Sequence, residues 1–241
     1  MKRIIHIVCL FSGLMFLAPR CSVQRSPAWG KGSEVTILGL GDSITEGGPE
    51  FFSYLFPLDS MLKSGGYRVR FIGPRHSAQQ GDSIAHAGFS GKTAEYLAKN
   101  IDSIYTAFPA DIVLLHSGHN HFIEESPVDG IIRAQQSIIH TIKAKNPKAV
   151  VLVAAVITAG KLPKYEYIPA LNAAIKKMVD SLNDPSVLLV DQQKGWDWNL
   201  YTIHDKVHPN RAGANRIAGN WYNALTPLLK KKQRDENSAS R

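Results

Sequence analysis

Residues 35–45 read Val-Thr-Ile-Leu-Gly-Leu-Gly-Asp-Ser-Ile-Thr, an apolar run that ends in a glycine, an aspartate and a serine. Near-continuous Val, Ile and Leu without alternation is typical of a strand buried on both faces, as the strands of a parallel sheet are. We therefore expect a first strand over residues 35–40. Four more such runs follow at residues 69–72, 112–115, 150–156 and 187–190.

Segments with helical spacing of apolar residues separate these strands. They lie at residues 52–63, 93–108, 128–145, 168–182 and 210–229. Alternating strands and helices predict an α/β protein, a three-layer α/β/α sandwich around a five-stranded, mostly parallel sheet with right-handed crossovers.

The chain has 241 residues and 44% hydrophobic content, and no Pro/Gly-rich linker divides it. One domain over residues 33–230 is therefore expected.

The first residues have a different character. Lys2 and Arg3 are followed by an apolar stretch over residues 4–18, which is too short to be a comfortable membrane span. A basic start before a short apolar stretch is typical of an export signal. Residues 1–28 are accordingly predicted to be a signal peptide or a lipoprotein signal, in preference to a membrane anchor or a buried strand.

The cleavage site of this signal is left open by the sequence. Pro19 and Arg20 precede Cys21, whereas both a peptidase site and a lipoprotein site call for small residues there. Residues 26–28, Ser-Pro-Ala, offer a second site. Lipidation of Cys21 would anchor the protein to a membrane, and later cleavage would leave it soluble. Either way we expect an exported protein, periplasmic or extracellular.

The net charge of +8 is concentrated at the two ends of the chain. Residues 1–20 carry three basic and no acidic side chains, and residues 230–241 carry five basic and two acidic ones, which leaves +2 for residues 21–229. A nearly neutral body argues against a nucleic-acid partner. Residues 231–241 are predicted to be a flexible basic tail.

Cysteine is scarce in this chain. Only Cys9 and Cys21 are present, and Cys9 lies inside the predicted signal. An exported mature chain would hold at most one cysteine, which excludes an intramolecular disulfide and makes a catalytic cysteine unexpected.

Two short motifs supply the side chains of an acyl-transfer site. Ser43 follows the first strand in a glycine-rich turn, and Asp205 and His208 stand three apart just before the last helix. A serine hydroxyl is a poor nucleophile until an imidazole takes its proton and a carboxylate orients that imidazole. Each motif alone also fits an ordinary helix cap or surface pair. Together, beyond the carboxyl ends of parallel strands, they predict a catalytic triad.

An acyl-transfer site also needs donors for the negatively charged oxygen of its intermediate. Asn120 follows the third strand and can offer its side-chain amide. Gly91 opens a helix after a turn and can offer its backbone N–H. We expect both at the same edge of the sheet as Ser43.

Four blocks in this order resemble the SGNH, or GDSL-type, hydrolase superfamily. They are Gly41-Asp42-Ser43, Gly91, Gly118-x-Asn120 and Asp205-x-x-His208. The resemblance implies a flavodoxin-like fold and no cofactor or metal. It also implies Ser43 as nucleophile, His208 as base and Asp205 as its orienter, with an oxyanion hole made by the N–H groups of Ser43 and Gly91 and the amide of Asn120. In the third block, His121 stands where the superfamily has aspartate.

A narrower resemblance is to secreted carbohydrate esterases of the acetylxylan-esterase type. The similar segments are residues 37–47, 71–73, 86–91, 191–196 and 205–210. This resemblance implies a serine esterase that removes short acyl groups, acetyl above all, from a polysaccharide or a smaller carbohydrate ester. A lipase-like enzyme, a lysophospholipase or a thioesterase of the same fold is the alternative. Acyl length, the alcohol and the oligomeric state stay open.

Several histidines and aromatic residues near this edge admit other interpretations. His116, His119, His121, His204 and His208 with Asp205 could bind zinc, but no His-Glu-x-x-His helix is present. We expect His119 and His121 to line the substrate pocket or to brace Asn120. Trp196, with Trp198 and Tyr201, fits either a sugar-stacking wall or core packing. A non-catalytic carbohydrate-binding protein is disfavoured because every catalytic block is filled.

Gly91-Lys92-Thr93 could also suggest a phosphate-binding loop. The pattern would need glycine at position 86, where the chain has His86, and the preceding segment is expected to be a loop, not a strand. Nucleotide binding is therefore not expected.

Overall fold

The computed structural model describes residues 34–79 and 81–239, so the predicted export signal over residues 1–28 lies outside the described residues. The strands are β1 (Val35–Gly41), β2 (Val69–Phe71), β3 (Arg75–Gln79), β4 (Asp82–Gly88), β5 (Ile112–His116), β6 (Val150–Ala155) and β7 (Val187–Asp191). The helices are α1 (Ser43–Glu46), α2 (Leu55–Ser64), α3 (Ala94–Ala107), the 3-10 turn η1 (Ile123–Glu125), α4 (Val128–Lys145), α5 (Ile168–Leu182), α6 (Trp198–Tyr201) and α7 (Arg211–Ala239).

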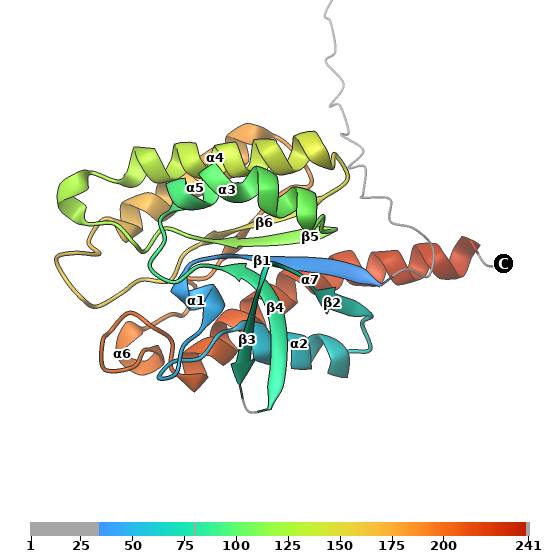
Figure 1. Ribbon diagram of the computed structural model, residues 1–241, viewed down its shortest axis with the longest axis horizontal. Helices are drawn as coiled ribbons and strands as arrows, with labels where there is room; N and C mark the ends of the chain where they lie inside the picture. Colours follow the sequence, from blue (N-terminus) through green and yellow to red (C-terminus); the bar gives the residue numbers. More distant parts are fainter. Residues whose placement is uncertain (1–33, 80, 240–241) are drawn as a thin grey trace, which may run out of the picture.

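The predicted three-layer architecture is confirmed. The five predicted strands form a parallel sheet in the order β2-β1-β5-β6-β7, which is the flavodoxin-like order. Helices α3, α4 and α5 cover one face, while α2 and α7 cover the other (Figure 1). The carboxyl ends of β1, β5 and β6 therefore meet at one edge.

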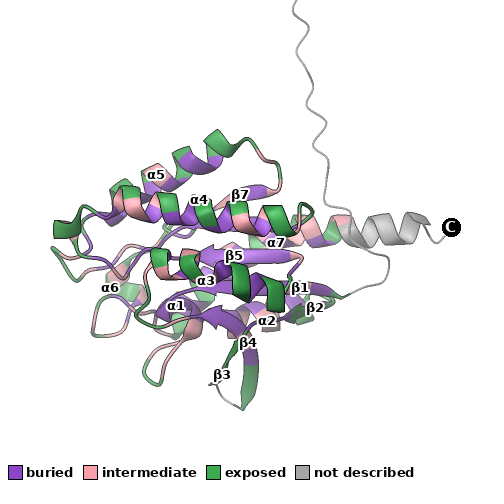
Figure 2. Ribbon diagram, turned by 45° about the horizontal axis from the view of Figure 1, so that its top comes forward, coloured by how far each residue is buried: buried purple, intermediate pink, exposed green. Residues whose placement is uncertain are grey.

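The central strands hold the core because their side chains are apolar on both faces. Every residue of β5 and β6 is buried, and Figure 2 shows β5 as a continuous buried band between the helical layers. The helices bury one stripe each; α4, for example, buries Ile131, Ile138 and Ile142. Each large aliphatic side chain removed from water in this way contributes about 1.5 to 3 kcal/mol.

The prediction of five strands was wrong, because the sheet has seven. The two missed strands, β3 and β4, form an antiparallel hairpin with Arg75 opposite His86. β4 pairs with the end of β1, and β2 pairs with its beginning, so both strands share one edge of β1. The hairpin was missed because it carries few apolar residues; its outer part is exposed (Figure 2). The segment before Gly91 is therefore a strand, not the expected loop.

Two helix boundaries also differ from the prediction. Helix α2 begins at Leu55, three residues later than expected, because residues 51–53 form a loop instead. Helix α7 continues to Ala239, so the segment predicted to be a flexible tail is helical as far as that residue. Lys, Gln, Arg and Glu are good helix formers, which explains the extension.

Among the described residues, no helix combines the length and the apolar character needed to cross a bilayer.

Candidate active site

Ser43 is the first residue of α1, directly beyond the end of β1. Asp42 caps this short helix, since its Oδ1 accepts the Ile44 backbone N–H at 3.0 Å. The turn needs glycine at position 41, because a Cβ there would lie 2.4 Å from the backbone oxygen of His116. The chain can therefore bend sharply at the sheet edge and present Ser43, which is 6% exposed.

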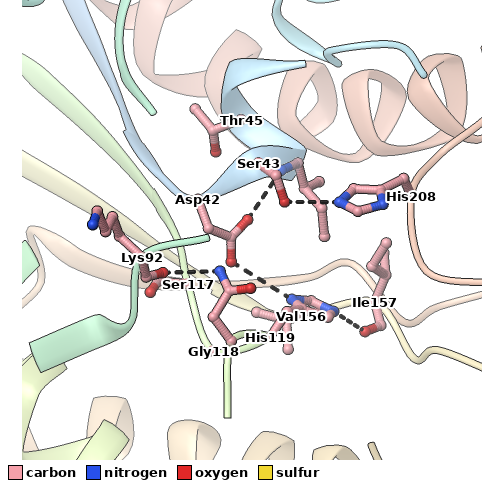
Figure 3. A network of polar contacts seen from close by, with 12 residues as sticks. Asp42, Ser43, Thr45, Lys92, Ser117, Gly118, His119, Val156, Ile157 and His208 are labelled. Carbon is pink, nitrogen blue, oxygen red and sulfur yellow. Dashed lines mark hydrogen bonds and ion pairs between the residues drawn. The ribbon is translucent and has the colours of Figure 1, made fainter. Parts of the chain in front are cut away.

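His208 and Asp205 complete a line of hydrogen bonds from Ser43. The Oγ of Ser43 lies 2.9 Å from Nε2 of His208, as Figure 3 shows. On the other side of the ring, Nδ1 of His208 lies 2.5 Å from Oδ2 of Asp205. Asp205 Oδ1 also accepts the backbone N–H groups of Val207 and His208. The structure thus brings together the three side chains that the sequence placed at opposite ends of the chain.

The hydrogen bonds decide which nitrogen of His208 carries the proton. A carboxylate only accepts hydrogen bonds, so Nδ1 donates to Asp205 and the lone pair of Nε2 faces the Ser43 hydroxyl. Burial raises the pKa of Asp205, but hydrogen bonds from the His208 side chain and from the backbone N–H groups of His208 and Val207 outweigh it, so the pKa is lowered overall. Asp205 is therefore charged at neutral pH and can orient the imidazole.

Phe51 is a site residue that the sequence did not reveal. Its ring stacks on His208 with 4.1 Å between centroids and 25° between planes. The next residue ties the loop down, because the Phe52 N–H donates to the Pro209 backbone oxygen at 3.1 Å. The only sequence feature that could have indicated this loop is the aromatic pair that follows Gly47 and Gly48. The helical spacing of apolar residues instead predicted a helix that begins at Phe52.

Gly91 and Asn120 lie on two loops that contact each other. Gly91 has a φ of +71°, a left-handed conformation that favours glycine. The Nδ2 of Asn120 donates to the backbone oxygen of Lys92 at 2.9 Å. An amide nitrogen has two hydrogens, so this contact holds the Asn120 side chain and leaves the second hydrogen for another acceptor.

Glu46 connects α1 to the Gly91 loop and was also missed. Its carboxylate accepts the Ser90 backbone N–H at 2.6 Å and pairs with Arg75 of β3. This contact joins the end of the nucleophile helix, the hairpin and the residue before Gly91. Because β3 was not predicted, no sequence pattern indicated it.

His119 lies beneath the nucleophile turn and does not line an open pocket. It is 2% exposed. Its Nε2 lies 2.8 Å from the Ile157 backbone oxygen, and its Nδ1 lies 4.0 Å from Oδ2 of Asp42 (Figure 3). Burial lowers the pKa of His119, against the opposing effect of Asp42. Of the two expectations for His119, this placement fits bracing of the loop rather than pocket lining.

His121 and Trp196 are also held by protein groups. His121 is 7% exposed, and its ring nitrogens face the carboxylates of Glu95 and Glu125. Trp196 is half-buried, and its Nε1 donates to the Thr158 backbone oxygen at 2.9 Å. The contacts of Trp196 fit core packing better than a free stacking wall.

The histidines considered as possible zinc ligands make separate contacts. His116 stacks on His119, with 5.6 Å between ring centroids, while His208 bonds to Ser43. Within residues 34–79 and 81–231, whose side chains the structure describes, no three His, Cys, Asp or Glu side chains come close enough together to hold a metal ion.

Comparison with known proteins identifies the family. The GDSL-like lipase/acylhydrolase family model matches residues 40–216, a span that contains every residue of the hydrogen-bonded line. The chain belongs to this family. It is therefore a serine-dependent carboxylic ester hydrolase with an SGNH-type fold. No curated protein matches this acylhydrolase in sequence.

Solved structures similar to this acylhydrolase include three esterases. A carbohydrate esterase family 3 protein from Talaromyces cellulolyticus is 28% identical with a TM-score of 0.72, and covers 82% of this chain and 99% of its own. A family 3 carbohydrate esterase from Clostridium thermocellum is 25% identical with a TM-score of 0.71, over 83% and 98% of the two chains. An acetyl esterase mutant with an acetate ion is 28% identical with a TM-score of 0.70, over 82% and 99%.

Proposed function

We propose that this acylhydrolase removes acetyl groups from a carbohydrate ester through an acyl-enzyme on Ser43. The single observation that carries the hydrolytic mechanism is the line of hydrogen bonds from Ser43 Oγ through the His208 ring to Asp205. In this line the base already faces the nucleophile, and the base is itself oriented by a charged carboxylate.

The reaction follows from these contacts. His208 Nε2 takes the proton of Ser43 as its Oγ attacks the ester carbonyl, and the developing oxyanion is held by the N–H groups of Ser43 and Gly91 and the amide of Asn120. His208 then gives the proton to the departing alcohol oxygen. Water, deprotonated by His208, then attacks the acyl carbonyl; the bond to Ser43 Oγ breaks, His208 returns the proton to Oγ, and the acid is released. Every step uses groups of this chain, so the proposal requires no cofactor.

The acetyl and carbohydrate parts of the proposal rest on similarity. The solved structures at 25 to 28% identity are named as carbohydrate esterases and as an acetyl esterase. The same segments that resemble acetylxylan-type esterases, residues 37–47 and 205–210, carry the nucleophile and the Asp/His pair. A carbohydrate ester is therefore the substrate class we propose.

Export is part of the same proposal. The basic start and the apolar residues 4–18 support an export signal, and a polysaccharide ester is a substrate met outside the cytoplasm. Mass spectrometry of the mature protein distinguishes a lipid-modified N-terminus at Cys21 from cleavage near residues 26–28. An intact N-terminus on protein recovered from the cytoplasm would contradict export.

Ser43→Ala tests the mechanism. We expect the variant to fold normally and to lose at least ~10³-fold in turnover of p-nitrophenyl acetate. Ser90→Ala is a matched control, because Ser90 is exposed and contacts Glu46 only through its backbone N–H. A fluorophosphonate should label the wild type at Ser43 and leave Ser43→Ala unlabelled. Near-native turnover by Ser43→Ala would refute the assignment.

Substrate preference tests the acetyl proposal separately. Hydrolysis of acetyl, butyryl and longer p-nitrophenyl esters should be fastest for acetyl, and acetylated xylan should release acetate. A preference for long acyl chains would instead identify a lipase-like or lysophospholipase role and leave the serine mechanism intact.

A further inference from the structure

His121 lies between two carboxylates that come from two different elements. Its Nε2 is 3.1 Å from Oε2 of Glu95, in the first turn of α3, and its Nδ1 is 3.5 Å from Oε2 of Glu125, in η1. The Glu95 oxygen lies off the axis of a ring N–H, so this contact is electrostatic and not a hydrogen bond. With both nitrogens facing carboxylates and 7% of the residue exposed, His121 is not free to bind substrate.

The position of His121 matters because it borders both halves of the proposed oxyanion hole. Asn120 is its neighbour in the chain, and Glu95 is one turn beyond the Gly91 loop. Asn120 already contacts this loop through the Lys92 backbone oxygen. The contact from His121 to Glu95 is a second link between the same two segments.

Other contacts hold the beginning of the Asn120 loop. Gln135 donates to the Ser117 backbone oxygen at 2.9 Å, and the Tyr167 hydroxyl donates to the Gly118 backbone oxygen at 2.6 Å. Both contacts precede Asn120. Beyond Asn120, Lys164 Nζ lies 4.2 Å from the centre of the Phe122 ring and Ile123 packs against the core, and the side chain of His121 adds contacts to α3 and η1.

We propose that His121 is a positioning residue for the oxyanion hole: by bridging Glu95 and Glu125, it holds the Asn120 amide at a fixed place relative to the Gly91 N–H. This inference rests on the proposed function, in which those two groups bind the oxyanion. It also explains how a chain with histidine at the third-block aspartate position keeps its loop in place. Aspartate at position 121 would face two like charges, so the bridge requires a side chain without a negative charge.

Steady-state kinetics with p-nitrophenyl acetate test this role. His121→Ala should lower kcat by about 10- to 100-fold and leave KM nearly unchanged, because a misplacement of about 1 Å acts on the transition state more than on substrate binding. Glu95→Gln, on a half-exposed side chain, should lower kcat in the same direction without risk to folding. His140→Ala is the matched control on an exposed face of α4 and should keep wild-type kcat.

A double-mutant cycle separates positioning from a general effect on stability. Asn120→Ala alone should cost on the order of 10²- to 10³-fold in kcat. If His121 acts through Asn120, adding His121→Ala to Asn120→Ala should cost little more. Additive losses in the double variant, or wild-type kcat for both His121→Ala and Glu95→Gln, would overturn the proposal.

Changing the charges at positions 121 and 95 gives an independent test of this role. His121→Asp should be less active than His121→Asn, and the double variant His121→Asp/Glu95→Gln should recover part of the loss, because one repulsive carboxylate is removed. Wild-type activity in His121→Asp would overturn the proposal. If the proposed function itself were wrong, Ser43→Ala would stay active, whereas failure of this inference alone would leave Ser43→Ala inactive.

Discussion

Asp42 is a fully buried carboxyl one residue before the nucleophile. Its Oδ1 accepts the Ile44 N–H, and its Oδ2 faces Nδ1 of His119 at 4.0 Å, which is longer than a hydrogen bond. Burial raises the pKa of Asp42, against the opposing effects of His119 and the Ile44 N–H. The pKa directions of Asp42 and His119 both favour the neutral form of the pair.

This raised pKa predicts the effect of Asp42→Asn on stability. A carboxyl group whose pKa is higher in the folded protein than in the unfolded chain stabilises the fold fully at pH values below its unfolded pKa. This stabilisation is lost as pH rises through the folded pKa. Asparagine keeps the acceptor for the Ile44 N–H and cannot ionise. We therefore expect Asp42→Asn to match or exceed the wild type in free energy of unfolding at neutral pH, with an advantage that shrinks as pH falls.

Urea unfolding of both proteins at neutral and mildly acidic pH measures this difference. If Asp42 were instead charged and paired with a charged His119, the asparagine would leave a buried imidazolium without its partner. A loss of about 3 kcal/mol at neutral pH, typical of a broken buried ion pair, would contradict the prediction.

At the scale of elements, one buried side chain joins α5 to the end of β6. Asn172 is 3% exposed. Its Oδ1 accepts the Val156 N–H at 2.7 Å, and its Nδ2 donates to the Val156 backbone oxygen at 2.8 Å. Val156 directly follows β6, where the strand ends and the chain leaves the sheet. The amide therefore satisfies backbone groups that would otherwise be buried and unpaired.

Asn172→Leu should lower the free energy of unfolding by about 2 to 4 kcal/mol, because it leaves a buried N–H and a buried C=O without partners. Lys176→Ala is the matched control one turn further along α5, where the side chain is exposed and its ion pair with Asp180 should contribute less than about 0.5 kcal/mol. Urea unfolding compares the two. Equal losses in both variants would show that the Asn172 hydrogen bonds do not stabilise the fold.

Strands and helices whose side chains are buried were predicted from the sequence, whereas strands with exposed side chains were missed. The strands buried on both faces, β1, β5 and β6, carry continuous apolar runs, and their positions were predicted within one or two residues. The hairpin of β3 and β4 was missed because its residues are largely polar and its pairing satisfies backbone groups near solvent. Helix α4 matched its predicted bounds because its apolar spacing is regular.

For the whole molecule, two buried histidines predict loss of stability in acid. Burial lowers the pKa of His86 to about 4 and that of His116 to about 3, from a usual value of 6.5. A lowered histidine pKa means that the unfolded chain binds more protons, so stability falls as pH drops from about 6.5 toward 4. We expect the free energy of unfolding to decrease steeply over this interval.

His116→Leu checks the cause of this decrease. Neither ring nitrogen of His116 has a hydrogen-bond partner, so leucine removes a titrating group without breaking a hydrogen bond. The variant should be at least as stable as the wild type at neutral pH, with a shallower decrease in acid. An unchanged acid slope, measured by urea unfolding across the same interval, would exclude His116 as a contributor.

The sequence by itself determined the three-layer α/β architecture, the helix and strand positions in the core, and the chain order of Ser43, Gly91, Asn120, Asp205 and His208. These features depend on local patterns: apolar runs, helical spacing, and side chains placed just beyond strand ends. Only the tertiary structure decided that Phe51 stacks on His208, that Glu46 joins Arg75 and Ser90, and that His121 lies between Glu95 and Glu125. Such contacts join loops distant in sequence, and their geometry is set by the packing of whole elements rather than by local propensity.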